Sequence, residues 1–101
     1  MAVNSDGNPV FGAYFWGTPS GDHKIEASTE MVTGVWYHIA GTWSEDSDKL
    51  RIYVNGTLDG TNTLSGTTAY MRYSQSYNYI GRCYASSTSC SNGYMDVMVD
   101  N

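Results

Sequence analysis

Aromatic rings recur beside polar and charged side chains in several segments, a combination that could bind a sugar. In the alternating segment 49–55, Arg51 and Tyr53 lie on the side opposite Leu50 and Ile52. The C–H faces of a sugar pack on aromatic rings, while its hydroxyl groups need directional partners. We predict a ligand-binding surface formed by Tyr14, Trp16, Arg51, Tyr53, Tyr94 and Asp96. The alternative is that these aromatic residues pair across strands and only stabilise a sheet.

An acidic segment, "SEDSDK" (44–49), offers oxygen ligands for a metal ion. Asp46 and Asp48 could bind Ca²⁺, which prefers carboxylate and carbonyl oxygens. The segment lacks the glycine and the downstream glutamate of an EF-hand loop, and a solvated acidic turn explains the same residues. We therefore expect no required cofactor and keep calcium as a weaker alternative.

Glu26 and Glu30, in "EASTE" (26–30), are the pair of carboxylates considered for catalysis. Glycoside hydrolysis needs two carboxyl groups roughly 5–10 Å apart across a cleft. The sequence also contains no Gly-x-Ser-x-Gly elbow and no metalloprotease helix motif. We expect that the protein is not an enzyme.

Trp36, His38 and Trp43 could be taken for a ligand cluster. Alternation along a strand would place Trp36 and His38 on one face and Trp43 on the other, so the three side chains would not converge. We interpret them instead as core residues with a hydrogen-bonded histidine.

The elements that position these residues are short strands. Segments 10–16 and 23–27 predict a hairpin, and 35–43 is apolar at nearly every position, which is typical of a central strand covered on both faces. Asn55-Gly56 predicts a type I′ turn between 49–55 and a returning strand at 57–61. Asn55-Gly56-Thr57 also matches a glycosylation sequon, although the turn explains the same residues.

The rest of the chain predicts a long connection and two further strands. Residues 65–77 show little periodicity, 77–83 predicts a strand, and 93–100 alternates Met95, Val97 and Val99 with polar residues. Several short strands without a helix favour one antiparallel β-sandwich over residues 1–101.

Composition excludes several classes of function. Ten acidic residues against five basic ones give a net charge of −5, which opposes binding to nucleic acid or to an anionic membrane. No apolar run reaches the roughly 20 residues of a membrane span, and the first residues do not form a signal peptide, so an export signal would lie outside this chain.

Cys83 and Cys90 bracket a loop of small residues. A disulfide between them predicts an oxidising, extracellular setting. The alternative is a pair of metal ligands, but no second pair of Cys or His residues with zinc-like spacing stands nearby.

Four motifs follow one another in a familiar order: "GVWYHIAGTW" (34–43), "KLRIYVNGTLDG" (49–60), "YIGR" (79–82) and "GYMDVMVD" (93–100). This series resembles the laminin-G-like or concanavalin-A-like jelly-roll domains of secreted bacterial proteins, over about residues 34–100. The resemblance implies an all-β, antiparallel jelly-roll sandwich. Many members of this family carry a calcium site at the sandwich rim. The glucanases of this fold use a Glu-x-Asp-x-x-Glu array for catalysis, and this sequence lacks that array.

Two departures from the family pattern stand out. Only residues 3–27 are available for the N-terminal strands, so we expect a minimal or truncated sandwich. The closing "VMVDN" lacks the usual Arg-hydrophobic-Tyr ending, so we expect that the chain stops early or is one module of a longer protein.

We expect a non-catalytic module that binds a glycan or glycoprotein outside the cell. The rival hypothesis is a structural domain of a cell-surface or virion protein that self-associates through sheet edges. Strands 10–16 and 93–100 carry Asp96 and Asp100 as their only charges and no proline, so we also predict a homo-oligomer.

Overall fold

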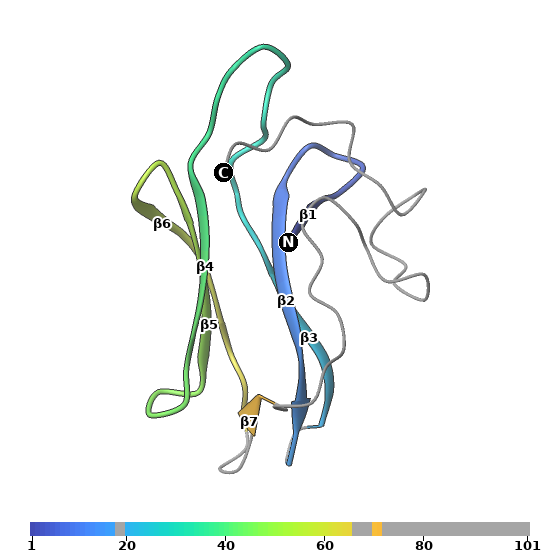
Figure 1. Ribbon diagram of the computed structural model, residues 1–101, viewed down its shortest axis with the longest axis vertical. Helices are drawn as coiled ribbons and strands as arrows, with labels where there is room; N and C mark the ends of the chain where they lie inside the picture. Colours follow the sequence, from blue (N-terminus) through green and yellow to red (C-terminus); the bar gives the residue numbers. More distant parts are fainter. Residues whose placement is uncertain (18–19, 66–69, 72–101) are drawn as a thin grey trace.

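The computed structural model describes residues 1–17, 20–65 and 70–71. Within these residues the chain forms two antiparallel sheets that face each other, and no helix (Figure 1). Sheet A contains β1 (Ala2–Val3), β2 (Pro9–Trp16), β3 (Gly21–Glu26) and β7 (Tyr70–Met71). Sheet B contains β4 (Ile39–Ser44), β5 (Lys49–Val54) and β6 (Thr57–Thr63) in that order.

Sheet A is built around β2. The predicted hairpin is confirmed, because β2 pairs with β3 from Val10↔Glu26 to Phe15↔Gly21. Along its other edge β2 pairs with β1 near its start and with β7 at its end, through Trp16↔Tyr70. The predicted connection 65–77 therefore contains a short strand.

The predicted hairpin of sheet B is also confirmed. Asn55 and Gly56 have φ angles of 51° and 80°, the positive values that a type I′ turn needs at both central positions. Leu50, Ile52 and Val54 are buried on one side of β5, as the alternation predicted.

The prediction of a doubly covered strand over 35–43 is wrong for residues 35–38. The strand begins only at Ile39, and among the described residues β4 pairs with β5 alone, so β5 is the central strand of sheet B. Val35 and Trp36 belong instead to the segment between β3 and β4, which projects beyond the two sheets (Figure 1).

The projecting segment has a turn of its own. The N–H of Val35 donates to the carbonyl oxygen of Val32 at 3.4 Å, across a glycine, Gly34, with a φ angle of 85°. The hydroxyl of Tyr37 accepts a hydrogen bond from the N–H of Val32 at 3.3 Å. Val32 and Val35 thus form hydrogen bonds within the segment, and both side chains are exposed.

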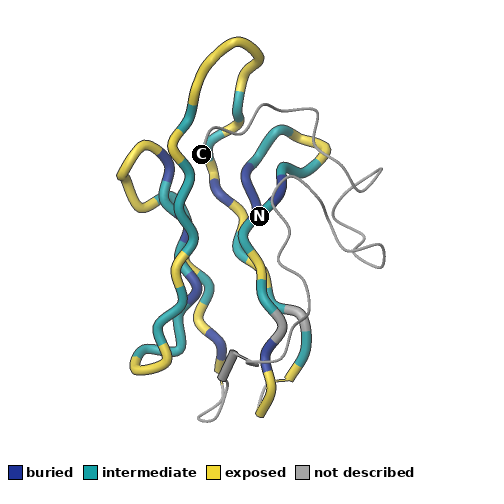
Figure 2. Tube along the Cα trace, in the orientation of Figure 1, coloured by how far each residue is buried: buried dark blue, intermediate teal, exposed yellow. Residues whose placement is uncertain are grey.

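The core lies between the two sheets (Figure 2). One cluster contains Phe15, Leu50 and Leu64, and a second contains Ala27, Ile52 and Val54. Phe11 and Ile25 pack against both clusters. The side-chain amide of Asn62 in β6 donates to the carbonyl oxygen of Lys24 in β3 at 2.8 Å, which joins the sheets by a direct hydrogen bond.

Some predictions fall outside the described residues. These are the strands expected at 77–83 and 93–100, the Cys83–Cys90 disulfide, and the side chains of Tyr94 and Asp96.

Candidate functional site

The strand β5 presents three side chains to the outer face of sheet B. Leu50 and Ile52 are fully buried between the sheets. Because side chains alternate along a strand, Lys49, Arg51 and Tyr53 point to the opposite side. Two of the predicted site residues, Arg51 and Tyr53, therefore lie on one surface.

Cross-strand pairing gives each of these side chains two neighbours, since directly opposed residues share a face. Arg51 lies between Thr42 of β4 and Thr61 of β6. In the same way, Tyr53 lies between Ala40 and Leu58, and Lys49 lies between Ser44 and Thr63. We call these nine residues the outer face of sheet B.

A β-bulge keeps a carboxylate off this face. The register shifts between Ile52 and Tyr53, which leaves Asp59 as an extra residue in β6. The carboxylate of Asp59 accepts a hydrogen bond from the N–H of Thr29 at 2.8 Å, and the Ser28 hydroxyl donates to the Asp59 carbonyl oxygen at 3.3 Å. Asp59 is therefore hydrogen-bonded to Ser28 and Thr29, the residues that follow β3 of sheet A.

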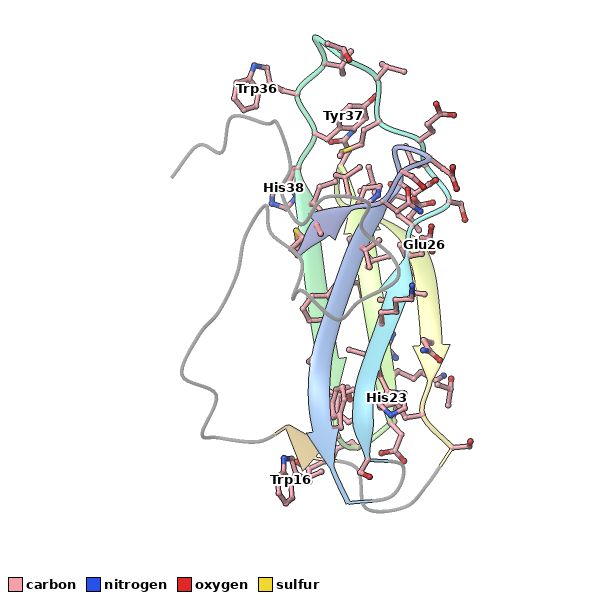
Figure 3. All side chains as sticks on the ribbon, turned by 90° about the vertical axis from the view of Figure 1, so that its right-hand side faces the viewer. Trp16, His23, Glu26, Trp36, Tyr37 and His38 are labelled. Atoms are coloured by element: carbon pink, nitrogen blue, oxygen red, sulfur yellow. The ribbon has the colours of Figure 1, made fainter. Side chains whose placement is uncertain are left out.

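Trp16 does not join Arg51 and Tyr53, so the prediction of one shared surface is wrong on this point. Its neighbour in β2, Phe15, is fully buried between the sheets, and Trp16 is 40% exposed at the end of the strand. Alternation places Trp16 on the outer side of sheet A, away from sheet B, and Figure 3 shows its side chain at the end of β2. Tyr14 lies in the same strand, opposite Asp22.

Of Trp36, His38 and Trp43, only Trp43 packs against the core. The Trp43 and Phe15 rings pack with their centroids 4.5 Å apart. Trp36 is 66% exposed, so its interpretation as a core residue is wrong (Figure 3). His38 is exposed, and its backbone N–H donates to the side-chain oxygen of Asn55 at 2.9 Å.

The acidic residues lie in two other places. Asp46 and Asp48 belong to the turn between β4 and β5, and the carbonyl oxygen of Asp48 accepts a hydrogen bond from the N–H of Leu64 at 2.8 Å. Among the described residues, no group of three His, Cys, Asp or Glu side chains could hold a metal ion. Calcium binding stays a prediction. Glu26, at the end of β3, accepts a hydrogen bond from the side-chain amide of Asn4.

The sequence did not identify four neighbours of Arg51 and Tyr53: Lys49, Thr42, Thr61 and Leu58. Lys49 stood in the same alternation as Arg51 and could have been found from it. The other three come from neighbouring strands, and only the pairing register brings them to this face.

The described part of the chain contains no helix that is long and apolar enough to cross a membrane.

One of three comparisons with known proteins found a match. A laminin-G-type family model, described as the Concanavalin A-like lectin/glucanases superfamily, matches residues 1–99. The comparison with curated proteins gave no match, and neither did the comparison with solved structures. The two facing antiparallel sheets and the family match together confirm the predicted jelly-roll sandwich. The chain belongs to the Concanavalin A-like lectin/glucanases superfamily.

Proposed function

We propose that this protein is a non-catalytic carbohydrate-binding module and that the outer face of sheet B is its binding surface. The observation that carries the proposal is the pairing register, which sets the Tyr53 ring beside a row of Thr42, Arg51 and Thr61. Membership of a superfamily that includes lectins supports it.

The chemistry of this face suits a sugar. Tyr53 and Leu58 offer apolar surface for the C–H groups of a pyranose ring. Arg51 provides several N–H donors, and the threonine hydroxyls both donate and accept hydrogen bonds. The strands hold these groups in fixed rows, so a saccharide would lie across them without reordering the backbone.

The same face supports a binding role without catalysis. Hydrolysis of a glycosidic bond needs two carboxyl groups on either side of the bond. The nine residues of the outer face of sheet B include no aspartate or glutamate. An extracellular setting, which the predicted Cys83–Cys90 disulfide favours, would give such a module access to cell-surface glycans and glycoproteins.

A glycan array tests the proposal. We expect wild-type protein to bind at least one glycan class with an affinity between about 1 µM and 1 mM, and Tyr53→Ala to abolish the signal. Trp16→Ala is the matched control, because it removes an aromatic side chain from the other sheet and should leave binding intact. The proposal is wrong if no glycan binds with or without calcium, or if Tyr53→Ala binds as well as wild type.

A second candidate is a structural domain that assembles through sheet edges. On the side of β2 that faces β1 and β7, residues 11–14 pair with no described strand. An edge of this kind can pair with a strand of another copy. In sedimentation velocity at micromolar concentration, this candidate predicts a species heavier than the 11.1 kDa monomer, and a single species of that mass would contradict it.

A further inference from the structure

The charges of the chain are unevenly distributed. The sequence has five Lys and Arg residues against ten Asp and Glu residues. Two of the five cations, Lys49 and Arg51, point from one strand to the outer face of sheet B, which includes no acidic residue. An acidic protein thus has a cationic strip along its central strand β5.

Described carboxylates near this strip do not neutralise Arg51. Asp59 is hydrogen-bonded to the N–H of Thr29. Asp46 and Asp48 lie in the turn beyond the start of β5, so Lys49 is the strip residue nearest to them in sequence. Within the described part of the chain, neither Lys49 nor Arg51 forms an ion pair with a carboxylate.

We infer that the saccharide bound at this face is anionic and carries carboxylate or sulfate groups. The inference rests on the proposed function and specifies its ligand class. The planar guanidinium of Arg51 can bind two oxygens of one such group at once, and Lys49 can bind a second group as a point charge. Alternate residues of a strand are about 7 Å apart, so the two cations would contact different anionic groups of an extended chain.

The net charge of −5 does not oppose this binding at physiological salt. The Debye length at 0.15 M ionic strength is about 8 Å, so acidic residues elsewhere on the molecule are largely screened. A direct contact between Arg51 and an anionic group is screened much less. The local cations therefore decide which saccharide binds.

Isothermal titration calorimetry with three oligosaccharides of matched length tests the inference: neutral dextran, polygalacturonate and dextran sulfate. We expect an anionic oligosaccharide to bind about tenfold or more tightly than dextran at 0.15 M NaCl. Arg51→Gln should reduce that preference to about threefold or less. A stronger response to polygalacturonate would identify carboxylate as the recognised group, and a stronger response to dextran sulfate would identify sulfate.

Two controls separate this inference from the function on which it rests. Lys24→Gln removes a cation from sheet A and should keep the anionic preference. If dextran binds as tightly as the anionic probes, or if Lys24→Gln reduces the preference as much as Arg51→Gln, the inference is wrong and the proposed function stands. If none of the three probes binds, the inference is wrong, and the glycan array decides whether the proposed function stands.

Discussion

Replacement of Gly41 by alanine is expected to destabilise the protein by about 3 kcal/mol, a large part of the 5–15 kcal/mol that typically holds a small domain together. A Cβ atom at Gly41 would lie 2.2 Å from the ring of Phe11, far inside van der Waals contact. Phe11 cannot move away freely, because it packs against both core clusters. Urea unfolding monitored by circular dichroism measures the loss.

A double mutant shows whether this contact is the cause. Phe11→Ala removes the ring atoms that the new methyl group meets, so Gly41→Ala combined with Phe11→Ala should lose less than the sum of the single losses. Ala40→Val is the matched control. It adds methyl groups to the same strand on the outer face and should change stability by about 0.5 kcal/mol or less. Strict additivity of the two core changes would contradict the packing described here.

Replacement of Trp43 by alanine is expected to cost about 3 kcal/mol, whereas Trp36→Ala should cost about 0.5 kcal/mol or less. The Trp43 ring packs on the fully buried Phe15, so its removal leaves a cavity between the sheets. The Trp36 ring is mostly in water already. The two tryptophans lie only seven positions apart in the sequence, so the pair is a matched comparison.

Guanidinium unfolding of both tryptophan variants, followed by far-UV circular dichroism, checks this prediction. Equal losses of stability for Trp36→Ala and Trp43→Ala would show that Trp36 is part of the core. That result would restore the interpretation of 35–43 as a strand covered on both faces.

The sequence predicted elements well wherever local rules dominate. The alternation of apolar and polar residues along β5 predicted its buried side, because alternate residues such as Leu50 and Ile52 share one face of a strand and are buried together. Asn55 and Gly56 gave the turn, since few other residue pairs tolerate positive φ at both positions. Both rules depend on neighbours in the chain.

Prediction failed in the segment between β3 and β4, where a turn interrupts the apolar pattern. Residues 35–38 have the composition of a strand, but Val35 closes a turn at Gly34, where its N–H donates to the carbonyl oxygen of Val32 at 3.4 Å. The composition of the segment cannot reveal that bond.

The candidate site depended on two facts that no local pattern provides. A two-residue turn alone would pair Ile52 with Asp59, but the bulge pairs Ile52 with Gly60 and brings Thr61 beside Arg51. Gly60 permits this, because a Cβ atom there would lie 2.7 Å from the carbonyl oxygen of Glu26. Likewise, alternation within β2 and β5 could not show that Trp16 and Tyr53 belong to different sheets.

The most direct test of the central claim is an ¹H–¹⁵N correlation spectrum of the labelled protein titrated with an oligosaccharide that it binds. The account predicts that the largest shifts fall on the backbone amides of Thr42, Arg51, Tyr53 and Thr61, in all three strands of sheet B. The amide of Trp16, in sheet A, should change little. Largest shifts in β2 and β3, with sheet B unaffected, would contradict the assignment of the binding surface.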